Sequence, residues 1–115
     1  MLLFVYGTLR SEFDNEYARM LRAGSESLGR AAVMGSIFRL GDYPGYRPHP
    51  PGEVHGDLYR LTDPERMLAI LDAWEGPEFQ RIPIRTSIGE DAWIYRFEGE
   101  PPPEQLIASG DFFPA

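Results

Sequence analysis

The carboxylate of Glu75 is the side chain in this sequence best suited to moving protons. It follows Trp74, the last apolar residue of a predicted helix, and therefore lies at the negative end of the helix dipole, which raises the pKa of a carboxyl group. A carboxyl group with a raised pKa can accept and return a proton near neutral pH. Many helices also end in an ordinary solvated glutamate, so the position alone leaves both interpretations open.

The turn at residues 6–9 (YGTL) is the second candidate for chemistry. It directly follows an apolar run, and backbone amides beyond the end of a buried strand lack strand partners. Such amides can bind an anion or a carbonyl oxygen. A glycine that only supplies the turn explains the same residues, and taken alone this pattern is ordinary.

The composition excludes several other chemistries. All 11 basic residues are arginine, and the chain has no cysteine. It therefore lacks a Schiff-base or P-loop lysine, a catalytic thiol, disulfides and thiolate metal sites. His49 and His55 do not have the spacing of metal ligands, and we interpret both as structural or surface residues. No serine lies in the strand-Gly-x-Ser-x-Gly context of an activated nucleophile.

Length and charge limit the class of protein. A chain of 115 residues predicts a single domain over residues 1–115, with one core and no second domain. The net charge of −7 disfavours nucleic-acid and membrane partners, since both attract basic surfaces. No apolar stretch is long enough to span a bilayer, and the N-terminus lacks the basic flank of a signal peptide. We therefore expect a cytoplasmic protein.

Short strands and two helices are expected to position these residues. Apolar runs and alternation predict strands at 2–6, within 29–40 with a break at Gly35, at 54–61, and at 79–88 and 92–97 as a hairpin. One helix is predicted to follow a Ser11 cap and to end at Gly24. The other spans Asp63 to Trp74, with a capping box formed by Thr62 and Glu65.

Between these elements, the proline-rich segment 41–52 is predicted to be a loop only. The tail from Gly99 ends in apolar residues, including Phe112 and Phe113, and is expected to dock on the body. Several strands with too few helices for repeated βαβ units predict an α+β domain with a curled, mixed or antiparallel sheet.

Three segments together resemble the gamma-glutamyl cyclotransferase-like family: FVYGTLR at 4–10, LDAWEG at 71–76 and FQR at 79–81. Supporting matches at 40–45, 54–59, 93–95 and 107–111 occur in the family's order, so the resemblance covers nearly the whole chain. Two departures are visible. Trp74 stands where tyrosine is common, and the chain lacks the insertions of longer members that are specific for glutathione.

The resemblance implies a small mixed β-barrel-like sheet with flanking helices, a cavity at the barrel mouth, and no metal or organic cofactor. It implies cyclisation of a small γ-glutamyl compound to 5-oxoproline, with release of a free amine or amino acid. Glu75 would be the general acid/base. The residues expected to bind the substrate are Tyr6, Gly7, Thr8, Leu9 and Tyr95.

Three questions stay open at this level. The substrate class includes γ-glutamyl amino acids, γ-glutamyl amines such as isopeptide fragments, and an acyl group in a biosynthetic pathway. A non-catalytic small-ligand binding domain with the same cavity is the main alternative, and a protein-interaction domain that uses an exposed apolar tail is another. The sequence does not give the oligomeric state.

Overall fold

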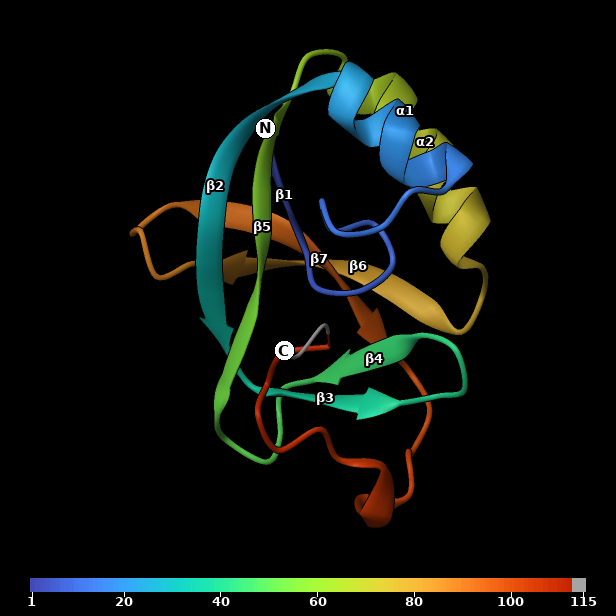
Figure 1. The fold of residues 1–115 in the computed structure, drawn as a ribbon, viewed down its shortest axis with the longest axis vertical. Helices are drawn as coiled ribbons and strands as arrows, with labels where there is room; N and C mark the ends of the chain where they lie inside the picture. The colour runs from blue at the N-terminus through green and yellow to red at the C-terminus, as the bar shows by residue number, and fades with distance from the viewer. Residues whose placement is uncertain (113–115) are drawn as a thin grey trace.

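In the computed structural model, which describes residues 1–112, seven strands form one sheet and two helices pack beside it (Figure 1). The elements in chain order are β1 (Leu2–Val5), α1 (Glu16–Ala23), β2 (Ser25–Met34), β3 (Ser36–Arg39), β4 (Pro44–Arg47), β5 (Glu53–Leu61), α2 (Pro64–Glu75), β6 (Phe79–Arg85), β7 (Asp91–Phe97) and a short 3₁₀ turn, η1 (Pro103–Gln105). The mixed α+β class predicted from the sequence is confirmed. Neither α-helix of the described residues is long and apolar enough to cross a membrane.

Strand β1 lies near the middle of the sheet, whose order is β2-β5-β1-β7-β4-β3 with β6 on the other edge of β7. All four of its residues are buried, as the continuous apolar run predicts for a strand covered on both faces. It runs antiparallel to β5 and parallel to β7, where Leu3 lies opposite Trp93. The N-terminal run therefore has a buried strand on each side.

Two strands, β1 and β4, pair with the same edge of β7 at different points along it, and the site lies where they separate. Strand β1 pairs with β7 at Trp93, whereas β4 pairs with it further along, at Arg96. Strand β1 ends at Val5, so its continuation and β4 diverge from each other beside Tyr95. A fork between strands leaves space that side chains must fill or that a ligand can enter.

The sheet curls but does not close. Its ends are β2 and β3, and among residues 1–112 no ladder joins them. The β6–β7 turn contacts β2, where the Ser87 N–H donates to the Ala32 carbonyl (2.8 Å) and the Ala32 N–H donates to Ser87 Oγ (2.9 Å). The barrel-like closure that the resemblance implied is therefore not confirmed.

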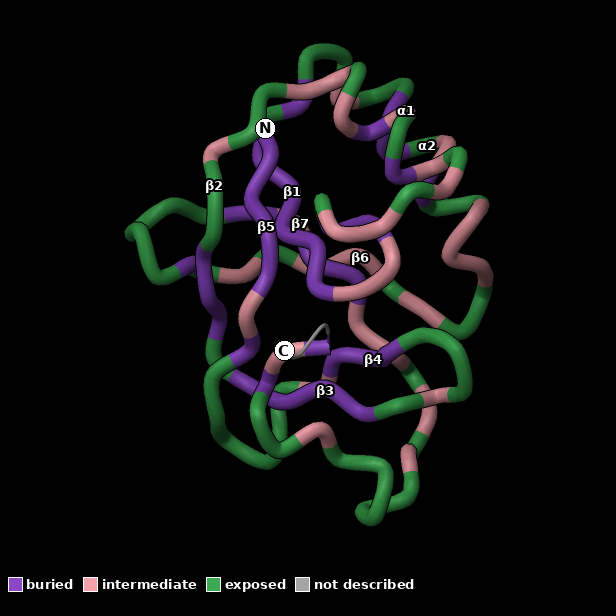
Figure 2. The backbone as a smooth tube through the Cα atoms, in the orientation of Figure 1, coloured by how far each residue is buried: buried purple, intermediate pink, exposed green. Residues whose placement is uncertain are grey.

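Alternation along β1 builds two cores, because successive side chains of a strand point to opposite faces. Leu3 and Val5 pack with buried residues of both helices, including Leu21 of α1 and Leu71 of α2. On the opposite face, Phe4 belongs to a cluster enclosed by the curled sheet. The buried backbone runs through the centre of the molecule, and exposed residues lie on the outer turns (Figure 2).

The prediction that residues 41–52 form only a loop is wrong, because β4 forms within them. Strand β4 pairs antiparallel with β3 and parallel with β7, in spite of beginning at a proline. Proline is tolerated at the first residue of a strand, where its missing N–H costs no ladder bond. The rest of the segment connects β3 to β4 and β4 to β5.

The helix caps also differ from the predictions. Asn15, not Ser11, caps α1, because its side-chain oxygen accepts the Ala18 N–H at 2.8 Å. The Ser11 amide is instead held by Asp57 Oδ2 at 2.7 Å, which keeps this part of the chain outside the helix. At α2 the N-cap is Asp63, which makes no capping hydrogen bond through its side chain, so the predicted capping box is absent.

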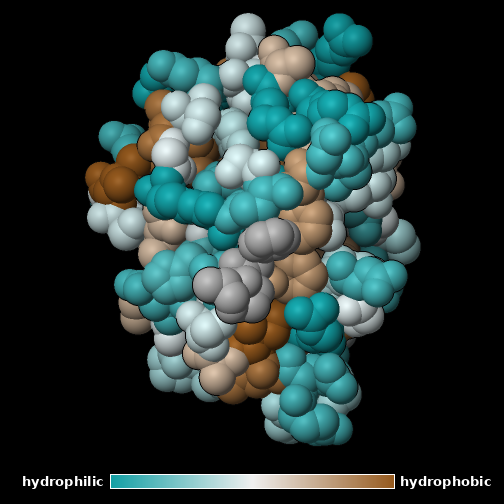
Figure 3. All heavy atoms as spheres, in the orientation of Figure 1, coloured by the Kyte–Doolittle hydropathy of each residue, from teal (hydrophilic) through white to brown (hydrophobic). Residues whose placement is uncertain are grey.

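The tail docks on the body, as far as Phe112. Its Phe112 ring is buried and stacks on Phe13 with centroids 6.0 Å apart, and the Gly110 carbonyl accepts the His55 N–H at 2.8 Å. Leu106 forms an isolated bridge with Phe38 of β3. Phe113 lies outside the described residues. In the space-filling view, an apolar strip is visible on the face of the molecule that carries the described part of the tail (Figure 3).

Candidate active site

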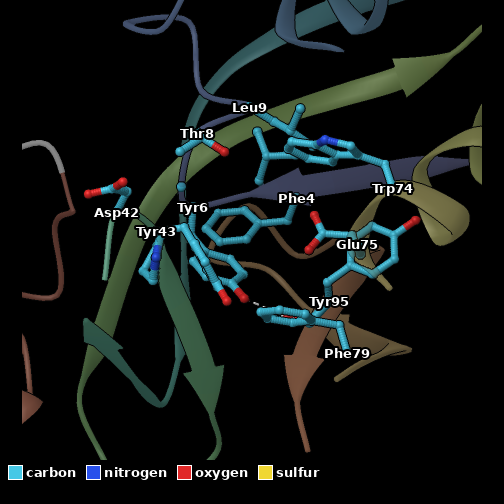
Figure 4. A pocket seen from close by; sticks show the side chains of 13 residues that line it. Phe4, Tyr6, Thr8, Leu9, Asp42, Tyr43, Trp74, Glu75, Phe79 and Tyr95 are labelled. Carbon is cyan, nitrogen blue, oxygen red and sulfur yellow. Dashed lines mark hydrogen bonds between the residues drawn. The ribbon is translucent and has the colours of Figure 1, made fainter. Parts of the chain in front are cut away.

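A cavity of about 350 Å³ opens in the fork between β1 and β4 (Figure 4). The six residues singled out in the sequence all line it: Tyr6, Gly7, Thr8, Leu9, Glu75 and Tyr95. They come from the end of β1, the end of α2 and the middle of β7, so the fold brings together residues up to 89 positions apart. The structure thus supports one shared site, and the roles of the six residues remain predictions.

Tyr6 fills the base of the fork. Its hydroxyl donates to the Tyr95 carbonyl at 2.7 Å and accepts the Tyr46 N–H at 3.0 Å. The Tyr95 carbonyl and the Tyr46 N–H belong to neighbouring strands but are not bonded to each other. The phenol hydroxyl bridges them and so replaces a missing bond of the strand ladder. Burial, followed by the charge of Glu75, raises the pKa of Tyr6 well above its usual value. The Tyr6 hydroxyl is therefore already hydrogen-bonded to the backbone, and a ligand in the cavity would contact the Tyr6 ring.

The loop after β1 supplies unpaired amides. A tight turn is closed by the Arg10 N–H donating to the Gly7 carbonyl at 3.0 Å. The two central residues of such a turn, Thr8 and Leu9, keep their N–H groups free. No hydrogen bond among the described residues uses the amides of Gly7, Thr8 or Leu9. Gly7 is required here by close approach, because a Cβ on it would lie 2.8 Å from Pro44 Cδ.

Behind this loop lies a network of alternating charges. Arg10, only 1% exposed, contacts Glu12 at 2.7 Å and Asp111 of the tail at 2.5 Å. Glu12 also pairs with Arg30, which reaches Asp57 at 3.1 Å. Burial opposes ionisation of Glu12, but hydrogen bonds from both arginines outweigh it and lower its pKa to about 2. The loop is therefore anchored to β2, β5 and the tail.

Glu75 is the last residue of α2, as predicted, and the chain turns away at Gly76 with φ of 84°. The buried side chains Met67, Leu68 and Leu71 fix the helix against the sheet, which directs its last turn toward the fork. Figure 4 shows the Glu75 carboxylate pointing into the cavity, toward the ring of Phe4. Among the described residues, no group donates a hydrogen bond to this carboxylate.

The pKa of Glu75 is raised to about 7, mainly by burial and further by the charge of Asp72. The direction agrees with the prediction from the sequence, and the causes in the structure are burial and a neighbouring charge. A carboxyl group that is half protonated at neutral pH can serve as either acid or base. That property is what proton transfer at this position needs.

Asp72, one turn earlier, is fully engaged. It accepts hydrogen bonds from Tyr95 Oη at 2.6 Å and from Arg81 Nε and Nη2 at 2.9 and 3.1 Å. Burial opposes its ionisation, but these donors lower its pKa. Arg81 is therefore paired with α2 and does not line the cavity. The Tyr95 hydroxyl consequently points out of the cavity toward α2, and its ring forms the wall (Figure 4).

Sequence reasoning missed part of the opposite wall. Asp42, Tyr43 and Pro44, from the β3–β4 connection, line the cavity together with Phe4 and Phe79. The segment 40–45 had already been noted as a match to the family, which was the available indication. A predicted loop at 41–52 carries no local signal of its position relative to β1, so these residues are not among the predicted site residues.

The cavity's charges are all acidic. Asp42 and Glu75 line it, and no arginine or histidine does so among the described residues. No group of three or more side chains in residues 1–112 has the arrangement of a metal site. What remains is an aromatic chamber with free amides on one side and a carboxyl group of pKa about 7 on the other. Such a chamber can bind a compact polar molecule and transfer protons within it.

Comparison with solved structures shows the same fold in other organisms. An uncharacterised protein from Pyrococcus horikoshii is 24% identical with a TM-score of 0.79, over 97% of this chain and 89% of that one. An aig2-like protein (ggact) from Mus musculus is 23% identical with a TM-score of 0.76, over 97% and 87% of the two chains. Protein ytfP from Escherichia coli is 34% identical with a TM-score of 0.60, over 98% and 96%.

A comparison with curated protein sequences gave no match. The family model described as gamma-glutamyl cyclotransferase, AIG2-like, matches residues 3–113, which is nearly the whole chain. This match confirms the resemblance that the segments at 4–10 and 71–76 indicated. The chain belongs to the gamma-glutamyl cyclotransferase, AIG2-like family.

Proposed function

We propose that this protein cyclises the γ-glutamyl group of a small amide or amine conjugate to 5-oxoproline and releases the free amine or amino acid. The observation that carries the proposal is the Glu75 carboxyl group, which has no hydrogen-bond partner among the described residues, points into the cavity and has a pKa of about 7. Family membership supports a role of this general kind. The substrate and the assignment of Glu75 are parts of the proposal.

In this reaction the substrate provides its own nucleophile. Its α-amine attacks the γ-carbonyl carbon, the new C–N bond closes a five-membered ring, and the bond to the leaving amine breaks. No side-chain nucleophile is needed, which agrees with a chain that has neither lysine nor cysteine. The protein's task is to fold the substrate and move protons. Holding two reacting groups in place supplies up to about 7–11 kcal/mol in the best intramolecular cases.

Glu75 performs the proton transfers. Its carboxylate accepts a proton from the α-ammonium group, which frees the amine's lone pair for attack. The resulting carboxylic acid protonates the departing nitrogen, and the regenerated carboxylate takes the second proton from the new ring nitrogen, which leaves a neutral lactam. One group can serve these steps because its pKa of about 7 makes both protonation states accessible. The acidic cavity also accepts the cationic ammonium group without repulsion.

The loop amides bind the substrate's oxygens. The N–H groups of Thr8 and Leu9 are free and belong to a turn fixed from behind by the Arg10 network. Fixed donors of this kind stabilise a carboxylate or a developing oxyanion without needing to reorganise. In a cavity that no basic side chain lines, they are the donors available for an anionic oxygen.

Release of 5-oxoproline is the direct test. Wild type and Glu75→Gln are incubated with γ-glutamyl amino acids, glutathione and γ-glutamyl-ε-lysine, and 5-oxoproline is measured. We expect release from at least one conjugate and about a 10²–10⁴-fold lower turnover in the variant, with binding retained. A variant with the wild-type rate would show that Glu75 is not the acid/base. Binding of conjugates without release by the folded wild type would instead favour the non-catalytic binding domain.

A further inference from the structure

Asn15 uses one side chain to form hydrogen bonds to two parts of the chain. Its Oδ1 accepts the Ala18 N–H at 2.8 Å and so caps α1, while its Nδ2 donates to the Thr8 carbonyl at 2.8 Å. Thr8 and Leu9 line the cavity, and Asn15 does not. One side chain therefore joins the start of a helix to the peptide group between Thr8 and Leu9.

The orientation of that peptide follows from its planarity. The peptide bond between Thr8 and Leu9 is trans, since the one cis bond among the described residues is at His49-Pro50. In a trans peptide the carbonyl and the N–H point in opposite directions. The Leu9 N–H therefore points away from Asn15, which holds the Thr8 carbonyl and is not part of the cavity wall that Leu9 helps to form. This N–H has no partner among the described residues.

We propose that Asn15 is a positioning residue, whose side-chain amide aims the Leu9 N–H at an oxygen of the bound glutamyl group. The inference rests on the proposed function, because it assigns a purpose to one of the free loop amides. Asn15 itself does not touch the substrate. Its effect passes through a single rigid peptide plane, so a small rotation of that plane would move the donor away from its acceptor.

The residue type supports this assignment. Asparagine, aspartate and serine cap helices comparably well, because each offers an oxygen to the first free amides. Only asparagine among them offers an N–H donor on the same side chain, and here that donor is used on Thr8. A cap alone would not require it. The bond to Thr8 is therefore a second, separable task of Asn15.

Asn15→Asp separates the two tasks, because it keeps the capping oxygen and removes the donor. We expect kcat/KM for 5-oxoproline release to fall about 10-fold or more, since loss of one aimed donor typically costs more than this. The thermal midpoint should stay close to that of wild type, because an acidic cap suits a helix N-terminus. Asn15→Ser, which is neutral and also caps, should lose activity similarly and so exclude an effect of the added charge.

The matched control is Asp63→Asn at the cap of α2, which makes no side-chain capping bond and is not part of the cavity wall. It exchanges the same two residue types and should leave kcat and KM unchanged. A fall mainly in kcat for Asn15→Asp would place the Leu9 amide on the developing oxyanion, and a rise mainly in KM would place it on the substrate carboxylate. Wild-type kcat and KM in Asn15→Asp would overturn the inference.

A spectroscopic measurement keeps this inference separate from the proposed function. The Leu9 amide resonance is followed by NMR while 5-oxoproline is added to wild type and to Asn15→Asp. We expect a marked shift in wild type and a much smaller one in the variant. If no conjugate releases 5-oxoproline, the proposed function fails, and the resonance alone decides the inference. Equal Leu9 shifts in the two proteins would then overturn it.

Discussion

The loop that begins at Gly7 has unpaired polar groups among the residues that line the cavity and paired polar groups elsewhere. Thr8 and Leu9 line the cavity, and their amides have no partners in the described structure. In contrast, the charged network around Arg10 pairs each arginine with carboxylates, and Asn15 holds the Thr8 carbonyl. The paired groups thus hold the loop backbone in place, and the amides of Thr8 and Leu9 are left free to bind a ligand.

The last turn of α2 repeats the contrast within three residues. Asp72 accepts three hydrogen bonds, and its pKa is lowered. Glu75 accepts none from the described residues, and burial raises its pKa to about 7. In both places, hydrogen bonding and ion pairing decide the use of a polar group. Paired groups hold the structure, and unpaired groups at the cavity are left for chemistry.

Removing the buried cation should have the largest effect on stability. Arg10→Met leaves Asp111 without this partner and Glu12 with Arg30 only, in a region where Arg10 is almost fully buried. We expect a loss of about 3 kcal/mol in the free energy of unfolding, because an almost fully buried arginine loses three hydrogen bonds to ionised carboxylates. Urea denaturation measures it. An unchanged midpoint would show that the Arg10 network does not stabilise the loop.

The buried carboxyl group of Glu75 should make the free energy of unfolding depend on pH. Glu75 has a folded-state pKa of about 7 against an ordinary 4.5, so the folded protein holds this proton more tightly than the unfolded chain does. The resulting stabilisation is present below pH 4.5 and is lost as pH rises toward 7. We expect wild type to lose about 2 kcal/mol relative to Glu75→Gln across this range, after allowance for partial exposure. Parallel pH curves for the two proteins would contradict the raised pKa.

The hydroxyl at the base of the fork should have a smaller effect. Tyr6→Phe leaves the Tyr95 carbonyl and the Tyr46 N–H without their bridging partner. We expect a loss of about 1–3 kcal/mol by thermal or urea unfolding, as for buried backbone groups left unsatisfied. The matched control is Tyr17→Phe, since the Tyr17 ring stacks on Trp74 but its hydroxyl makes no hydrogen bond among the described residues. Equal losses of unfolding free energy in the two variants would show that the Tyr6 hydroxyl does not stabilise the fold by bridging the two strands.

The smallest effect is expected on the open surface. Arg85 pairs with Asp91 at 2.7 Å, but both side chains are more than two-thirds exposed. Arg85→Met, the same change as at Arg10, should cost less than about 1 kcal/mol, because water already solvates this pair. If urea denaturation gave it a loss equal to that of Arg10→Met, burial would not explain the difference between the two ion pairs.

Local patterns predicted most of the elements. The apolar run at 2–6, the periodicity of 63–74 and the alternation at 54–61 became β1, α2 and β5 with small changes at their ends. The misses have a common cause. Strand β4 depends on its partners β3 and β7, and the start of α1 depends on Asp57, which holds the Ser11 amide outside the helix. These partners come from distant parts of the chain and are not local properties of the sequence.

By itself, the sequence determined which residues could do the chemistry. It named Glu75 and the turn at 6–9, and it excluded lysine and thiol mechanisms, because these depend on residue type and local pattern. Only the tertiary structure decided that these residues share one cavity, that Asp72 is paired while Glu75 is not, and that the Tyr6 hydroxyl is used by the fold. The physical reason is that burial and hydrogen-bond partners, which set a group's pKa and availability, are contributed by segments far apart in the chain.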